Sequence, residues 1–328
     1  MKHYNIPVFV PHYGCPFSCV FCNQKEITGQ MSASELIDAE KNINNHLSTI
    51  TSGDVEIAFF GGSFTAIPEE IMISYLELGY KFILEGKVSG IRISTRPDFI
   101  NGKILDILKK YKVKTIELGA QSFSDDVLKK SGRGHTAEQT ISACKLTKDA
   151  GFNLGIQLMT GLPGDTHEHS VNSAIKAVSL NPDCVRIYPT LVISDTMLCK
   201  MYENGKYSPQ SLDEAVKTVG AMLNIFKSKN IPVIRVGLAS VSEMNNRGSI
   251  VAGPDHPALR ELCEGQAYLN TMLEFIKTHN TNHITVYAPN SEHSKIYGHK
   301  SVNSRFLKDN HNIKLTVKTS DDFLINNE

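Results

Sequence analysis

The 328 residues of this chain include 34 basic and 34 acidic side chains, so its formal net charge is zero. A balanced charge gives no global electrostatic argument for binding nucleic acid or a membrane surface, and any RNA site has to be local. The length allows one barrel-sized domain with a small appendage. Seven cysteines, no N-terminal apolar signal segment and no membrane-spanning apolar run favour a cytoplasmic protein with reduced thiols.

Short apolar stretches alternate with amphipathic stretches along most of the chain. This alternation predicts an α/β fold, a partial (β/α)6 TIM-like barrel of parallel strands and crossover helices with a small C-terminal α/β appendage. The expected strands are residues 6–10, 55–60, 91–94, 115–119, 154–159 and 183–188. The expected helices are residues 33–48, 68–84, 100–110, 136–150, 166–179 and 210–228.

Three cysteines, Cys15, Cys19 and Cys22, follow the first expected strand at the spacing Cys-x3-Cys-x2-Cys. In a barrel of this kind, the active side chains collect at the carboxyl ends of the strands. Structural zinc takes four ligands, usually from two separated pairs, so the spacing fits zinc poorly. A 4Fe-4S cluster fits better, because three sulfurs hold three irons and leave the fourth open to a small molecule. A disulfide with a spare thiol and a partial zinc site remain as alternatives.

This spacing, with the aromatic Phe21 beside the last cysteine, resembles the radical S-adenosylmethionine (SAM) superfamily. The resemblance implies that the open iron binds the amino and carboxylate groups of SAM. It also implies that one electron from the reduced cluster cleaves SAM to methionine and a 5'-deoxyadenosyl radical. The expected partner is then an electron donor such as flavodoxin or ferredoxin.

Gly61, Gly62 and Ser63 follow the second expected strand. Two glycines without Cβ atoms let the backbone approach a ligand, although Gly-Gly is also an ordinary tight turn. The segment resembles the glycine-rich motif of the superfamily, which binds the amino group of the methionyl moiety. Ser63 stands where many members have an acidic residue.

Polar side chains end the next strands and are expected to point into the barrel mouth, where they suit a ribose and a carboxylate. The expected SAM contacts here are Ser94, Arg96 and Gln121. The fifth strand adds Gln157 and Leu158, whose backbone and side chains suit an adenine ring on a strand edge.

Arg133 lies between two glycines, ahead of a helix that Thr136 is expected to cap. Its neighbours favour a positioned anion contact, such as the SAM carboxylate, over a solvated charge. Tyr188 at the end of the sixth strand is the candidate catalytic residue, expected to touch substrate or adenosine. The alternative is a barrel aromatic whose hydroxyl binds water.

Several segments look like the radical SAM domain of the Elongator catalytic-subunit family, which modifies the wobble uridine of tRNA. They are residues 96–98, 119–122, 133–136, 148–152, 161–164 and 187–193. The resemblance covers residues 1 to about 237 and implies tRNA or another RNA as partner.

Three departures separate this chain from that family. The gap between the first two cysteines is the general superfamily one, the residues after the barrel are too few for an acetyltransferase domain, and an N-terminal tRNA-binding extension is missing. A nearer resemblance is to short Elongator-like and coproporphyrinogen-oxidase-like radical proteins of anaerobic bacteria, which share residues 253–262.

We expect the barrel at residues 1–237, a linker and helical segment at 238–280, and a small α/β tail at 281–328. The tail predicts a strand, a helix, the loop 298–301, a second helix and a strand, an order that resembles the core of a KH RNA-binding module. The basic residues near that loop are Lys295, His299, Lys300, Arg305 and Lys308. An appendage with a solvated lysine loop is the alternative.

The sequence therefore predicts a radical SAM enzyme that modifies RNA, most simply tRNA. Two alternatives remain. One is a radical SAM enzyme acting on a small molecule of the tetrapyrrole type, which needs a broad apolar pocket with cations for the propionates. The other is an RNA-binding protein with a structural or redox-sensing cluster.

Overall fold

A computed structural model describes residues 3–10, 15, 17–22, 34–238 and 250–327 of the chain. Seven parallel strands form its main sheet in the order β1-β2-β3-β4-β5-β6-β8. They are β1 (His3–Val10), β2 (Asp54–Gly61), β3 (Gly90–Thr95), β4 (Val113–Gln121), β5 (Asn153–Thr160), β6 (Cys184–Pro189) and β8 (Val233–Val236). Because β1 and β8 each pair on one side only, the sheet is an open half-barrel.

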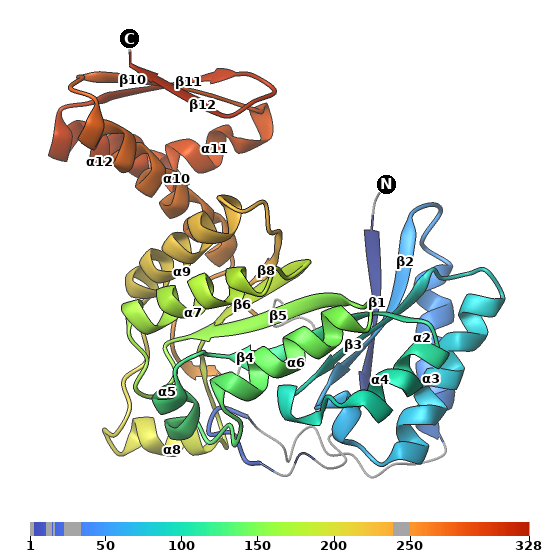
Figure 1. The fold of residues 1–328 in the computed structure, drawn as a ribbon. Helices are drawn as coiled ribbons and strands as arrows, with labels where there is room; N and C mark the ends of the chain where they lie inside the picture. Colours follow the sequence, from blue (N-terminus) through green and yellow to red (C-terminus); the bar gives the residue numbers. More distant parts are fainter. Residues whose placement is uncertain (1–2, 11–14, 16, 23–33, 239–249, 328) are drawn as a thin grey trace.

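Helices connect the strands; most of them cover the outer face of the sheet, whereas α5 and α8 lie at its edge, where the strands end (Figure 1). They are α2 (Ser34–Leu47), α3 (Glu69–Leu84), α4 (Gly102–Lys110), α5 (Asp125–Lys130), α6 (Ala137–Asp149), α7 (His167–Ser179), α8 (Met197–Glu203) and α9 (Leu212–Lys227). Capping boxes at Thr136 and Ser211 satisfy the first amide groups of α6 and α9. The core between sheet and helices is built from strand residues such as Ile57, Ile93 and Leu154, which are fully buried.

The structure confirms the partial TIM-like barrel and all six predicted strand and helix pairs. It adds a seventh strand, β8, which is four residues long and has an exposed Ile234, so its sequence carries little alternation. The short helices α5 and α8 and the two-stranded antiparallel sheet of β7 (Val192–Ile193) and β9 (Ile250–Ala252) are also additions.

A separate small unit follows the half-barrel. It contains α10 (Leu259–Thr278), β10 (His283–Ala288), α11 (His293–Tyr297), α12 (Val302–His311), β11 (Lys314–Thr319) and β12 (Leu324–Asn327). Its sheet has the order β11-β10-β12, in which β10 is parallel to β11 and antiparallel to β12. The predicted order of strand, helix, loop, helix and strand is present, and β12 is an addition.

Helix α10 joins the two units. Its residues Tyr268 and Met272 belong to the hydrophobic core of the tail. On its other side the Asn224 amide of α9 donates to the Ala267 carbonyl oxygen at 3.0 Å. The division of the chain at residues 238 and 281 stays a prediction. No helix in the described part of the chain is both long and apolar enough to cross a membrane.

Candidate cofactor site

The described part of the cysteine loop lies beside α5 and α8, at the edge of the sheet where the parallel strands end (Figure 1). Backbone hydrogen bonds hold it there. The Val20 amide donates to the Ser131 carbonyl oxygen at 3.1 Å, and the Leu198 amide donates to the Val20 carbonyl oxygen at 2.7 Å. A turn inside the loop brings the Cys22 amide to the Cys19 carbonyl oxygen at 3.0 Å. The loop is therefore fixed at the edge that the sequence predicts for the site.

The three thiols of the loop influence one another. Cys19 is buried, and Cys15 and Cys22 are half-buried. The pKa of Cys22 is raised to about 11, mainly by burial and to a smaller extent by the neighbouring Cys19 and Cys15, while Arg133 acts to lower it. Among the described residues, no three His, Cys, Asp or Glu side chains surround a common point as a metal site does. The cluster ligands Cys15, Cys19 and Cys22 stay a prediction.

Arg133 reaches the cysteine loop from the segment between α5 and α6. Its Nη1 donates to Cys19 Sγ at 3.3 Å, and its Nη2 donates to the Gly119 carbonyl oxygen at 2.7 Å. Neither Arg133 Nε nor the buried Ser131 Oγ has a hydrogen-bond partner in the described part of the chain. Buried donors without partners next to a thiol fit an anionic cofactor at this place.

Close packing on the cysteine loop requires a glycine directly after Arg133. Gly134 has a positive φ of 72°, and a Cβ atom on it would lie 2.2 Å from the Phe17 ring. The Phe17 ring in turn carries the Arg96 guanidinium over its face at 4.5 Å. The Gly-Arg-Gly pattern therefore lets this segment fold closely over the cysteine loop.

Arg96 is held by more contacts than the sequence predicts. Its Nε and Nη2 donate to the two carboxylate oxygens of Asp98, each at 2.9 Å. Its Nη2 also donates to the carbonyl oxygen of Arg133, and its Nη1 lies 4.0 Å from Cys19 Sγ. Arg96 therefore lies near the Cys19 thiol, but farther from it than Arg133 does.

The residues after β2 have internal contacts. Gly61 has a φ of 120°, and a Cβ atom on it would lie 2.4 Å from the Val10 carbonyl oxygen of β1. The buried Ser63 hydroxyl lies 2.9 Å from the Thr95 hydroxyl and accepts from the Arg96 amide at 3.2 Å. Gly61 and Ser63 therefore fix the ends of neighbouring strands. The prediction that Gly61, Gly62 and Ser63 bind SAM stays a prediction.

The polar ends of β4 and β5 meet. Gln157 donates through Nε2 to Gln121 Oε1 at 3.1 Å, and Gln121 has a φ of 66° at an irregularity in the pairing. Ser94 is half-buried. Leu158 is fully buried in the hydrophobic core, and its strand β5 pairs with β4 on one side and β6 on the other, so it is not a free strand edge. These SAM contacts stay predictions.

The two aromatic candidates, Phe21 and Tyr188, lie far apart in the sequence and have different surroundings. Phe21 packs against the small cluster that includes Val192 and Leu198. Tyr188 is half-buried, and its hydroxyl accepts from Arg186 Nη1 at 3.4 Å. The catalytic role of Tyr188 stays a prediction.

A buried charge network inside the half-barrel is a feature that the sequence reasoning missed. Arg92 donates through Nε to Glu56 at 2.9 Å and through Nη1 to Glu117 at 2.7 Å. Arg186 donates through Nη2 to the same Glu117 at 3.0 Å. Burial alone would lower the pKa of Arg92, but the charges of Glu117 and Glu56 outweigh it and raise the pKa. The sequence did carry a signal for this network, because charged residues stand within successive strands that are otherwise apolar.

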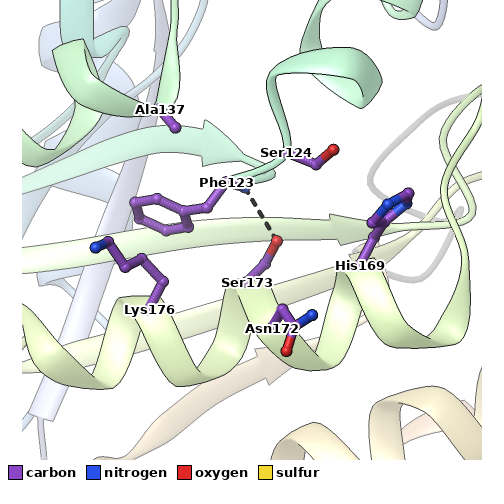
Figure 2. Close-up of a pocket in the computed structure, with 7 residues that line it drawn as sticks. All are labelled: Phe123, Ser124, Ala137, His169, Asn172, Ser173 and Lys176. Carbon is purple, nitrogen blue, oxygen red and sulfur yellow. Dashed lines mark hydrogen bonds between the residues drawn. The ribbon is translucent and has the colours of Figure 1, made fainter.

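Two cavities lie away from the cysteine loop. One of about 310 Å³ lies between α7 and the segments around α5 and α6 (Figure 2). Its lining is Phe123, Ser124, Ala137, His169, Asn172, Ser173 and Lys176, and Ser173 Oγ accepts from the Phe123 amide at 3.0 Å. The other, of about 570 Å³, lies between α9 and α10. Neither is lined by a residue predicted to bind the cluster or SAM, although Lys295 of the basic tail residues lines the second.

Comparison with known proteins decides the family. Residues 9–174 match the profile described as Radical SAM superfamily. The chain belongs to the radical SAM superfamily. Residues 182–270 match a second profile, Radical_SAM C-terminal domain. Radical SAM enzymes use a 4Fe-4S cluster and SAM, so the family identifies the cofactors that the cysteine spacing predicts.

Two relatives illustrate the closer similarities. The chain is 37% identical over 131 residues to a tRNA uridine(34) acetyltransferase of Methanocaldococcus infernus, which covers 39% of this chain and 24% of that protein. It is 31% identical over 192 residues to Elongator complex protein 3 of Danio rerio, covering 52% of this chain and 35% of that protein. The chain thus spans about a quarter to a third of these relatives.

A solved structure supports the fold. The Elp3 of Methanocaldococcus infernus with an N-terminal deletion superposes with a TM-score of 0.63 at 22% identity, over 84% of this chain and 63% of that one. The similarity therefore extends beyond the half-barrel at the level of backbone arrangement.

Proposed function

We propose that this radical SAM enzyme holds its cluster through Cys15, Cys19 and Cys22 and modifies tRNA. When bound, the cluster supplies the electron that splits SAM into methionine and a 5'-deoxyadenosyl radical. The observation that carries the cofactor part is the cysteine loop at the carboxyl edge of the strands, with the buried Arg133 donating to Cys19 Sγ.

The residues proposed to bind SAM surround that loop. Gly62, without a Cβ atom, would leave room for the methionyl group at the end of β2. Gln121 and Gln157, already joined by a hydrogen bond, would present amide groups to the adenosine. Arg133, with its unpaired Nε, would meet the SAM carboxylate. Tyr188 would face the substrate.

The substrate proposal rests on the Methanocaldococcus infernus relative, whose name, tRNA uridine(34) acetyltransferase, refers to a tRNA uridine. Since the chain spans a minor part of that protein, its acetyl transfer is not carried over. The inner charge network counts against the tetrapyrrole alternative, because Arg92 and Arg186 place charges on strands inside the half-barrel and are already paired with Glu117 rather than free for propionates.

The tail supports a large substrate. It lies at the opposite end of the molecule from α5, α8 and the cysteine loop (Figure 1), so a single ligand that touches both is a macromolecule. Four of the five predicted basic residues, His299, Lys300, Arg305 and Lys308, are exposed, whereas Lys295 is paired with Glu264 and Glu292. Exposed cations are the groups that contact RNA phosphates.

The tail loop is built rigidly. Lys300 and Ser301 have positive φ angles of 51° and 59°. The buried Asn303 amide fixes the loop by donating to the carbonyl oxygens of Gly265 at 2.8 Å and Ile296 at 3.1 Å. We propose that this loop contacts the RNA backbone, in a protein that acts in the cytoplasm with a flavodoxin or ferredoxin as reductant.

The test of the substrate is a mass measurement. Cluster-loaded enzyme, SAM and reductant are incubated with tRNA from a strain that lacks the gene, and the nucleosides are then separated. A uridine nucleoside of altered mass that depends on SAM and on Cys19 supports the proposal. Unchanged nucleosides, together with conversion of a tetrapyrrole under the same conditions, would favour the small-molecule alternative.

A further inference from the structure

The Cys19 sulfur lies next to two buried guanidinium groups. Arg133 Nη1 is 3.3 Å away and donates to it, and Arg96 Nη1 is 4.0 Å away. Both arginines are almost fully buried, with exposed fractions of 6% and 3%. At this depth, water screens their charges weakly, so their influence on a group at Cys19 is stronger than that of surface cations.

Both arginines are held in place by contacts that need no ligand. Arg133 is anchored through Nη2 to the Gly119 carbonyl oxygen at the end of β4. Arg96 is anchored by its two-point contact with Asp98, by the Phe17 ring, and by its bond to the carbonyl oxygen of Arg133. Asp98 offsets the charge of Arg96, so Arg133 is the cation of the pair without a carboxylate partner among the described contacts.

Hydrogen bonds to the sulfurs of an iron–sulfur cluster and nearby positive charge both raise its reduction potential, because reduction adds negative charge. We propose, on the basis of the function proposed above, that Arg133 sets the reduction potential of the cluster through Cys19 Sγ. Arg96 and Asp98 serve as positioning residues that keep Arg133 at the sulfur. This role is separate from SAM binding, because it acts on the cluster before SAM is present.

The test is a redox titration without SAM. Wild-type protein and the variants Arg133→Met, Arg133→Lys and Arg96→Met are loaded with iron and sulfide anaerobically, iron is counted, and the reduced cluster is followed by electron paramagnetic resonance. Arg260→Met is the matched control, because Arg260 is a half-exposed arginine paired with Glu264 on α10.

We expect Arg133→Met to lower the ratio of reduced to oxidised cluster at a fixed potential about tenfold, which is about 59 mV for one electron. Arg96→Met should give a smaller decrease, Arg133→Lys an intermediate one, and Arg260→Met none. If Arg133→Met binds no iron, the ratio of reduced to oxidised cluster in Arg133→Lys and Arg96→Met tests the inference instead.

Two results would overturn the inference in distinguishable ways. If the cluster-loaded variants of Arg133 and Arg96 show the same ratio of reduced to oxidised cluster as the wild type, the inference is overturned and the proposed function is left intact. Wild-type protein that assembles no cluster would overturn the proposed function, and this inference with it.

Discussion

Arg92 Nη1 lies 2.7 Å from Glu117 Oε1, with both side chains at least nine-tenths buried inside the half-barrel. Glu117 also faces Arg186, so it contacts two buried guanidinium groups, of which Arg92 has Glu56 as a second partner and Arg186 relies on Glu117. Removing one partner of a buried ion pair is far more costly than removing a surface pair, because a charge is left without compensation.

We therefore expect Glu117→Gln to lower the free energy of unfolding by about 3–5 kcal/mol, measured by urea denaturation. The control is Lys103→Met, which removes the exposed ion pair with Glu69 and should cost less than about 1 kcal/mol. Equal effects of the two substitutions would show that the inner network adds little to stability.

A second prediction concerns stability in acid. The pKa of His135 is lowered from the ordinary 6.5 to about 4, first by burial and then by the positive charges of Arg133 and Arg96. The unfolded chain thus binds a proton that the native chain excludes between these pH values. Stability should fall as the pH falls from about 6.5 to about 4, by up to about 3 kcal/mol from this residue.

His135→Gln removes this titration. The variant should show a flatter dependence of unfolding free energy on pH between 6.5 and 4 than the wild type, when both are measured by urea denaturation. Parallel curves for the two proteins would mean that His135 is not responsible.

The third prediction concerns Gly62. A valine there should block the methionyl part of SAM by its bulk and weaken SAM binding more than about tenfold, or about 1.4 kcal/mol, in equilibrium dialysis. Cluster absorbance should stay unchanged. Gly102→Val is the control, because a Cβ atom on Gly102 meets nothing within 4 Å. Unchanged SAM affinity in loaded Gly62→Val would contradict the proposed contact.

The fourth prediction concerns the tail. Lys300→Glu reverses one exposed charge at the tail loop and should weaken tRNA binding, with a larger loss at low salt, while SAM cleavage continues. Filter binding at several salt concentrations measures this. Lys109→Glu on α4 is the matched exposed control. Equal binding by both variants would remove the tail loop as an RNA contact and strengthen the tetrapyrrole alternative.

The strands and helices of the half-barrel could be predicted because each is long enough to show its pattern: β2 is a mostly apolar, buried run, and the buried residues of α3 recur at helical spacing. Strand β8 has too few residues for that. In the site, the cysteine spacing and the glycines around Arg133 were readable. The contact of Arg133 with Cys19 was not, because it joins positions 114 residues apart and exists only when Gly134 lets its segment pack on Phe17.

The pairing within the charge network could not be predicted from the sequence either. Glu117 and Arg92 lie within predicted strands, yet a strand pattern alone does not say which inner residues of different strands meet. Their pairing follows from the register, which sets Arg92 beside Thr115 and Ser94 beside Glu117. Long-range pairing of this kind needs the assembled sheet.

We propose above that this chain forms a 5'-deoxyadenosyl radical from SAM at a cluster on Cys15, Cys19 and Cys22. The most direct measurement is to incubate anaerobically loaded protein with dithionite and SAM and to quantify 5'-deoxyadenosine by mass spectrometry. We predict 5'-deoxyadenosine from brown wild-type protein and none from a colourless variant with alanine at the three cysteines. Wild-type protein that holds stoichiometric zinc without iron, or loaded protein that releases no 5'-deoxyadenosine, would contradict the account.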